Sequence, residues 1–162
     1  MELRQSILVL LLAIAAVSNA SAADNSTYNK LQTARLSADE AEVWKVIEEW
    51  NAAFSDNDVE RYFSFIDDDI TVITPSNPYR VEGISDDREE FELGIRFGYS
   101  RVSLFQEISP MVRVFGDVAY VSYFNRGYYG PESGGKFSYL KETDVLRRVA
   151  GNWKIAHIHV SD

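Results

Sequence analysis

The chain has 162 residues, contains no cysteine and carries a formal net charge of −9. A chain of this length forms one domain that buries roughly two-thirds of its unfolded surface. The lack of cysteine excludes disulfides and lipoprotein attachment. The negative charge repels phosphate groups, so we expect neither nucleic acid nor an anionic membrane as a partner.

The first 22 residues have the pattern of a cleavable signal peptide. Arg4 precedes an apolar stretch over residues 7–17 that is too short to cross a bilayer comfortably, and Ala20-Ser21-Ala22 fits the small-residue cleavage rule. We therefore predict a signal peptide at residues 1–22 and a periplasmic or secreted protein. An uncleaved membrane anchor is the alternative, but the polar stretch over residues 23–36 follows at once and indicates a flexible leader.

Two helices are predicted next. Ser37 and Glu40 have the spacing of a capping box, in which each side chain bonds the backbone of the other residue. Apolar side chains then recur at spacings of four, three and four residues, which places them on one helix face. They are Val43, Ile47, Trp50 and Phe54. This helix is expected to run to about Ser55, and residues 59–65 read as a short second helix.

A strand and a third helix follow. Asp67-Asp68-Asp69 is interpreted as a solvated turn that leads into the strand "ITVIT". Ser85 is the expected cap of a third helix, and Phe91 and Ile95 are its core candidates.

From residue 100 onward the chain is rich in strand patterns. The runs "RVSLFQEI", "MVRVF", "VAYVSYFNRGYY", "FSYLKETDVLRRV" and "WKIAHIHV" are alternating or aromatic. Ser109-Pro110, Gly116-Asp117 and Ala150-Gly151-Asn152 are predicted turns between them. Helices followed by a meander of strands predict an α+β domain, in which a strongly bent antiparallel sheet wraps around three N-terminal helices. A bent sheet that helices close at one end leaves a conical pocket.

The order of elements and several stretches resemble the NTF2-like superfamily, which includes SnoaL-like proteins, ketosteroid isomerase and scytalone dehydratase. The stretch "EEWNAAFSDNDVERYFSFIDDDITVITP" is similar to the opening of that fold. The stretches "VRVFGDVAYVSYF" and "KETDVLRRVAGNWKIAHIHVS" are similar to the association domain of calcium/calmodulin-dependent protein kinase II. The resemblance covers about residues 40–162 and implies an NTF2-like domain at residues 37–162, paired through its sheet as a homodimer or assembled as a larger ring. It leaves the chemistry open, because the fold serves isomerases, dehydratases, cyclases and assembly modules.

His157 and His159 are the only histidines in the chain. Alternation along a strand places both on the face that carries Trp153 and Ile155. A zinc site needs at least a third ligand, and the sequence has neither a cysteine nor a further histidine, so we predict no metal. The resemblance implies that both histidines lie on the sheet face away from the pocket, although a pocket role for His159 as a base stays open.

The resemblance to ketosteroid isomerase implies three places for chemical groups. The place of its tyrosine falls on Trp50, that of its carboxylate base on Thr74, and that of its neutral aspartic acid on Asp144. A threonine hydroxyl is far too weak a base to take a proton from carbon. Steroid isomerisation is therefore not expected, and Asp144 is left as the candidate acid.

Further pocket candidates come from strand alternation. Glu142 shares a strand face with Asp144, and Tyr123 shares one with Asn125. The association-domain resemblance implies arginines at the places of Asn125 and Asp144, so anion binding is not expected here. In an apolar pocket, burial raises the pKa of Asp144 and makes it a proton donor near neutral pH, whereas a nearby arginine or lysine keeps it ionised.

The leading hypothesis is an exported, homodimeric SnoaL-like domain that binds a small, largely apolar molecule. Its expected ligand-binding residues are Trp50, Thr74, Tyr123, Asn125 and Glu142. One alternative is a cofactor-independent isomerase, dehydratase or cyclase, with Asp144 as acid and Glu142 or His159 as base. Another is a self-assembly scaffold without a ligand. Aromatic residues at these positions are also compatible with a plain core, and none of the three hypotheses requires a cofactor.

Overall fold

The computed structural model describes residues 30–98, 105–130 and 134–162. The predicted signal peptide at residues 1–22 and residues 23–29 of the predicted leader lie outside the described residues. Residues 30–33 form one helical turn, and residues Leu36–Asp162 form a separate compact unit. No helix in the described part of the chain is long and apolar enough to span a membrane.

The first two helices form where the sequence predicts them, as α2 (Ala38–Asp56) and α3 (Val59–Ser64). The capping box is confirmed: the Ser37 N–H donates to Glu40 Oε2 at 2.9 Å, and the Glu40 N–H donates to Ser37 Oγ at 3.3 Å. Asn57 adopts a left-handed φ of 55° and ends α2. The predicted apolar face is buried at Val43, Ile47 and Trp50.

Six strands form one curled sheet in the order β2-β1-β6-β5-β4-β3. Their bounds are β1 Ile66–Ile73, β2 Val81–Glu82, β3 Gln106–Phe115, β4 Val118–Tyr129, β5 Lys136–Val149 and β6 Asn152–Ser161. Neighbouring strands are antiparallel, except that β1 and β6 pair in parallel. The predicted antiparallel meander is confirmed from β3 to β6. The parallel pair joins strands that are far apart in the sequence, so no turn pattern predicts this pairing.

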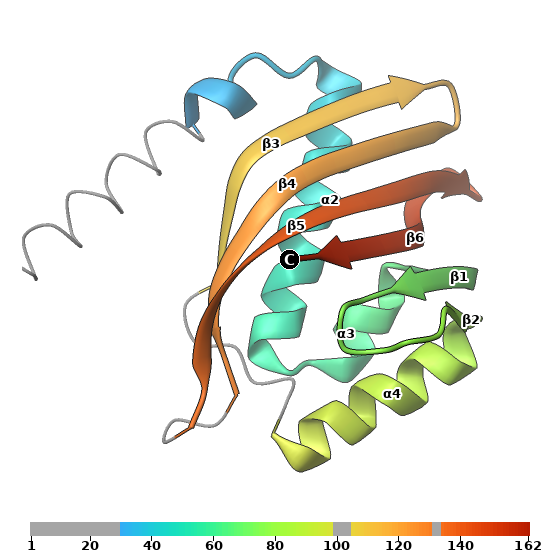
Figure 1. Cartoon of the computed structure of the whole chain (residues 1–162). Coiled ribbons are helices and arrows are strands. Elements are labelled where there is room, and N and C mark those ends of the chain that lie inside the picture. Colours follow the sequence, from blue (N-terminus) through green and yellow to red (C-terminus); the bar gives the residue numbers. More distant parts are fainter. Residues whose placement is uncertain (1–29, 99–104, 131–133) are drawn as a thin grey trace, which may run out of the picture. The chain divides into compact units, whose positions relative to one another are not determined.

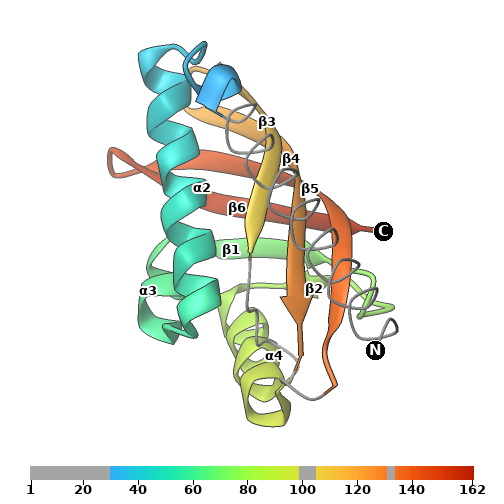
Figure 2. The same ribbon diagram turned by 90° about the vertical axis from the view of Figure 1, so that its left-hand side faces the viewer.

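The sheet curls around α2, which crosses its concave side (Figures 1 and 2). The third helix, α4 (Ile84–Phe97), lies against β1 and β2 at one end of the curled sheet. Buried side chains from the sheet and the helices fill the space between them, among them Trp44, Leu146, Trp153 and Ile155. The predicted α+β architecture, with a bent sheet around three N-terminal helices, is therefore confirmed.

Two irregularities shape the long strands. Ser109-Pro110 is not the predicted turn: it lies inside β3, where Ser109 has a φ of 58° and the pairing with β4 shifts between Ile108 and Met111. The pairing of β5 with β6 shifts between Val145 and Leu146. A bulge adds one residue to one strand and bends it, which lets strands of this length curl.

Two expectations at the ends of elements are wrong. The N-cap of α4 is Gly83 without a side-chain bond, so Ser85 lies inside the helix. Asp67 is no solvated turn residue, because it lies in β1 and is buried. The Arg147 guanidinium donates to both of its oxygens, with Nη2 at 2.6 Å from Oδ1. An ion pair thus takes the place of solvent at this carboxylate.

Candidate functional site

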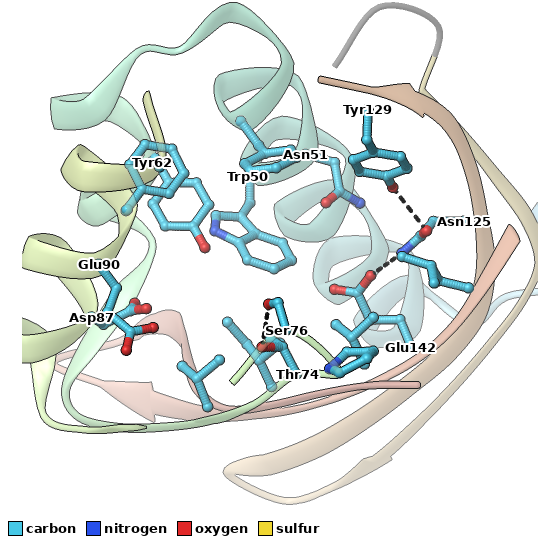
Figure 3. A pocket seen from close by; sticks show the side chains of 18 of the residues that line it. Trp50, Asn51, Tyr62, Thr74, Ser76, Asp87, Glu90, Asn125, Tyr129 and Glu142 are labelled. Atoms are coloured by element: carbon cyan, nitrogen blue, oxygen red, sulfur yellow. Dashed lines mark hydrogen bonds between the residues drawn. The ribbon is translucent and has the colours of Figure 1, made fainter. Parts of the chain in front are cut away.

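A cavity of about 640 Å³ lies between α2, α3, α4 and the inner face of the sheet (Figure 3). Its wall is mostly apolar, and the aromatic members are Trp50, Phe54, Tyr62, Phe91, Phe97, Phe105 and Tyr129. The other polar members are Asn51, Thr74, Ser76, Asp87, Glu90, Asn125 and Glu142. A concave, largely apolar wall with a small number of polar groups is the usual composition of a small-molecule site.

The three helices build the aromatic wall. The Trp50 ring of α2 packs on the Tyr62 ring of α3 with centroids 5.3 Å apart, and Tyr62 stacks on Phe91 of α4 at 4.3 Å. Phe54 contacts Phe105 edge-on at 6.3 Å. Because each ring is held by at least one other ring, the wall is formed before any ligand arrives.

Polar side chains of β4 and β5 form a hydrogen-bonded group on the sheet side of the cavity (Figure 3). The Tyr129 hydroxyl donates to Asn125 Oδ1 at 3.0 Å, and Asn125 Nδ2 donates to Glu142 Oε2. Asn51 Nδ2 of α2 donates to the Tyr123 hydroxyl at 3.2 Å. All three donors are neutral, so Asn125, which Tyr129 holds in place, orients the carboxyl of Glu142 without supplying a positive charge.

Two carboxyl groups project from the inner face of β5, because alternate residues of a strand share a face. Glu142 lies on the cavity wall, whereas Asp144 is fully buried in the core. Neither Asp144 oxygen has a hydrogen-bond partner of good geometry among the described residues. Burial raises the pKa of both carboxyls, and the charge of Glu142 raises the pKa of Asp144 further. The pair therefore keeps a proton at pH values at which an exposed carboxyl is ionised.

Asp87 and Glu90 of α4 lie on the opposite side of the cavity from Glu142 (Figure 3). Asp87 is only 8% exposed, and its Oδ2 atom accepts no hydrogen bond within the described part of the chain. Burial and the charge of Glu90 raise the pKa of Asp87 to about 6. Glu90 is exposed and accepts a hydrogen bond from Asn77 Nδ2 at 2.5 Å. Carboxyl groups therefore line two opposite walls.

Within residues 30–98, 105–130 and 134–162, no three His, Cys, Asp or Glu side chains are arranged to hold a metal ion.

The sequence profile of the calcium/calmodulin dependent protein kinase II association domain matches residues 39–162, which is most of the chain. The chain belongs to this association-domain family. No curated protein matches the sequence.

Solved structures agree with this membership. An NTF2-like protein of unknown function from Pseudomonas putida KT2440 is 26% identical over 76% of this chain and 86% of that chain, with a TM-score of 0.69. The association domain of the kinase from C. elegans is 25% identical over 77% of this chain and 96% of that chain, with a TM-score of 0.64. A candidate dehydratase of the NTF2-like family from Streptomyces avermitilis is 19% identical over 75% and 93% of the two chains, with a TM-score of 0.66, and shares the fold alone. The NTF2-like fold predicted from the sequence is thus confirmed.

The structure places four of the five predicted ligand-binding residues on the cavity wall. Trp50, Thr74, Asn125 and Glu142 line it, and the Thr74 hydroxyl hydrogen-bonds to that of Ser76 at 3.0 Å. The fifth, Tyr123, is buried but does not line the cavity. The candidate acid Asp144 likewise does not line it.

Sequence reasoning missed several polar wall residues, among them Asn51, Ser76, Asp87, Glu90 and Tyr129. A signal exists for Asp87, since it precedes Phe91 by four residues and residues at this spacing share a helix face. A signal also exists for Tyr129, since it follows Asn125 by four residues along β4 and alternate residues of a strand share a face.

The two histidines lie on the sheet face away from the cavity. Ile158 lines the cavity between them in sequence, and alternation directs His157 and His159 the other way. The predicted common face with Ile155 is wrong, because the bulge inserts a residue between Ile155 and His157. His157 Nδ1 hydrogen-bonds to Thr71 Oγ1 at 2.7 Å. His159 is exposed and does not line the cavity, so it is not placed to act there as a base.

The cavity differs from the arginine-lined pocket that the association-domain resemblance implies. Asn125 and Asp144 stand at the two implied arginine places. No lysine or arginine lies on the cavity wall within the described residues. The ionisable groups that the described residues bring to the wall include the carboxyls of Asp87, Glu90 and Glu142, which argues against an anionic ligand.

Proposed function

We propose that the domain binds a small, largely apolar molecule in the cavity between the three helices and the sheet. The observation that carries this proposal is the cavity itself, which measures about 640 Å³ and has a wall of mutually packed aromatic rings. A ligand that fills such a wall removes apolar surface from water, which is worth roughly 25 cal/mol per Å². The few polar groups would then set its orientation.

A neutral apolar dye tests this proposal. N-phenyl-1-naphthylamine should bind saturably, with a rise in its fluorescence and a rise in the melting temperature of the protein. Ser76→Trp places a bulky ring at an exposed position on the cavity wall and should weaken binding, whereas Ser85→Trp, at an exposed position that does not line the cavity, should not. Native mass spectrometry adds a search for a co-purified ligand. If no ligand co-purifies and the dye does not saturate, or if both variants bind alike, the proposal is wrong.

The proposal includes export and self-association. The signal-peptide pattern at residues 1–22 supports export to the periplasm or the medium. On the sheet face away from the cavity, Phe124 stacks on Tyr139 with centroids 5.4 Å apart, and Tyr128 contacts Phe137 at 5.3 Å. Phe137 and Tyr139 are 62% and 53% exposed, and an exposed aromatic patch of this kind favours pairing with a second copy.

Sedimentation velocity and N-terminal sequencing test these two parts. We expect a homodimer or a larger ring that Tyr139→Glu dissociates and that Asn152→Glu, at the exposed start of β6, leaves intact. The exported protein should begin at Ala23. A wild-type monomer at micromolar concentration contradicts self-association, and retention of residues 1–22 on the exported protein contradicts cleavage.

A second candidate function is a cofactor-independent isomerase, dehydratase or cyclase. The observation that favours it is the pair of buried carboxyls on β5, in which Glu142 lies on the wall and Asp144 lies behind it. Unequal environments let one carboxyl accept a substrate proton while the other stays protonated. In an isomerisation, Glu142 would take a proton from one carbon of the substrate and return it to another carbon of the same molecule. The substrate therefore gains and loses one proton, and the reaction balances.

Hydrogen exchange tests this candidate without knowledge of the substrate. 2-Cyclohexenone in D₂O should gain deuterium at C6, the CH₂ carbon next to its carbonyl, faster with the protein than without it. Glu142→Gln should abolish this catalysis, and Asp144→Asn should reduce it while the melting temperature is kept. Exchange at the buffer rate, or an undiminished rate in Glu142→Gln, rejects the candidate.

A further inference from the structure

The polar groups of the cavity wall are unbalanced in charge. Its ionisable acids are Asp87 and Glu90 on α4 and Glu142 on β5, and Figure 3 shows them on opposite sides of the same space. Among the described residues, no lysine or arginine lines the cavity to neutralise them. The remaining polar members are amides and hydroxyls.

The three acids differ in the hydrogen bonds that their carboxyl oxygens accept. Glu142 accepts a hydrogen bond from Asn125, and Glu90 accepts one from Asn77. Asp87 lines the cavity and is more than nine-tenths buried, yet its Oδ2 atom has no hydrogen-bond partner in the described residues. A buried acceptor without a donor is costly, and native proteins rarely leave one without a reason. A ligand that brings a donor to Asp87 would remove this cost.

The surroundings of Asp87 define the rest of such a ligand. The Tyr62 and Phe91 rings stack at 4.3 Å on this side of the cavity, and the Trp50 ring packs on Tyr62. Aromatic faces attract cations as well as apolar groups. A ligand with a positively charged group and an apolar part would therefore find a carboxylate for its charge and aromatic rings for its apolar part.

We propose that the ligand is a small hydrophobic amine, bound as its ammonium ion by Asp87 with its apolar part against the rings of Trp50, Tyr62 and Phe91. This inference rests on the proposed function of the cavity as a small-molecule site and adds the chemical class of the ligand. The ammonium supplies the missing donor to Asp87 Oδ2, and a charge-assisted hydrogen bond in a buried site is stronger than a neutral one. The excess of acidic residues over the whole chain favours the approach of a cation.

Binding of an ammonium requires ionised Asp87. The groups that face Asp87 are Glu90 on the same helix, Tyr62 of α3, and Glu142 across the cavity. None of them is cationic, and burial raises the pKa of Asp87 to about 6. At pH 5 only about one-tenth of Asp87 is ionised, so amine affinity should fall by about tenfold between pH 7.5 and pH 5.

Three probes of similar size and different charge test the inference. Phenethylamine is a cation, 2-phenylethanol is neutral and 3-phenylpropionate is an anion at pH 7.5. Calorimetry, together with the change in tryptophan fluorescence expected from the wall residue Trp50, should show phenethylamine binding about tenfold more tightly than the other two. Asp87→Asn should weaken phenethylamine by about tenfold and leave 2-phenylethanol unchanged. Asp86→Asn, an exposed neighbour with the same change of charge, should keep wild-type affinity.

The outcomes separate the inference from the proposed function. If 2-phenylethanol or 3-phenylpropionate binds as tightly as phenethylamine, the cavity is a binding site and the amine class is wrong. If Asp87→Asn keeps amine affinity while Glu142→Gln loses it, the assignment to Asp87 is wrong. If no probe binds and the neutral dye does not bind either, both the inference and the proposed function are wrong. Selective binding of phenethylamine that depends on Asp87 and weakens at pH 5 supports the inference.

Discussion

The stability of Asp87→Asn relative to the wild-type protein, both without ligand, should be higher at neutral pH than at acid pH. The pKa of Asp87 in the folded protein is about 6, against an ordinary value of 3.8, and burial is the main cause. A difference of about two pKa units corresponds to about 3 kcal/mol. Because the folded-state pKa is above the unfolded value, ionisation disfavours the fold: the cost is absent below about pH 3.8, grows as the pH rises and is complete above about pH 6. Asparagine cannot ionise, so the variant does not have the cost of burying a charge at this position.

Urea unfolding at pH 4 and pH 8 measures the effect. The buried amide of asparagine has its own desolvation cost of about 1–3 kcal/mol, but this cost does not depend on pH. The decisive quantity is therefore the change, between the two pH values, in the stability difference between variant and wild type. We expect it to favour the variant by about 2.5 kcal/mol at pH 8 relative to pH 4, because a small part of the cost is already present at pH 4. Asp86→Asn, exposed in the same turn, should show almost none of this change. Equal stability differences at the two pH values would refute the reasoning.

Two further predictions concern the ends of elements. Ser37→Ala should lower the free energy of unfolding in urea by about 1 kcal/mol, because it removes the cap of α2. Ser85→Ala should change it by no more than about 0.5 kcal/mol, because the Ser85 side chain does not cap α4. Equal changes for the two variants would contradict the capping assignment. Asp67→Asn should cost about 2 kcal/mol at pH 7 by weakening the bonds from Arg147, and exposed Asp68→Asn much less. Arg147 lowers the pKa of Asp67, so the stabilisation is present above the ordinary carboxyl pKa and is lost as the pH falls below it. A cost of Asp67→Asn that is as large at pH 3 as at pH 7 would exclude this ion pair as its source.

The candidate site was only partly predictable. Alternation along β5 correctly places Glu142 and Asp144 on one face, since the period of a strand is fixed by its backbone. It does not reveal that Glu142 meets the cavity while Asp144 lies in the core, because that depends on which distant parts of the chain cover each residue. Alternation also fails at the histidines, where one inserted residue in β6 reverses the faces.

Local patterns of the sequence were sufficient for the elements themselves. The capping box at Ser37, the apolar spacing of α2 and the two-residue turn at Gly116-Asp117 involve neighbours within a few positions, so their physics is already present in a short segment. Together with the resemblance of residues 40–162 to a known family, they were enough for the helices, the antiparallel meander and the class of fold.

Tertiary structure decided which side chains share a space. The ion pair between Asp67 and Arg147, the parallel pairing of β1 with β6, and the placement of the buried acid Asp87 opposite Glu142 all bring together residues that are far apart in the chain. The cost of burying a charge depends on every element that covers it, and no single segment carries that information. The acidic character of the cavity is therefore a property of the assembled fold.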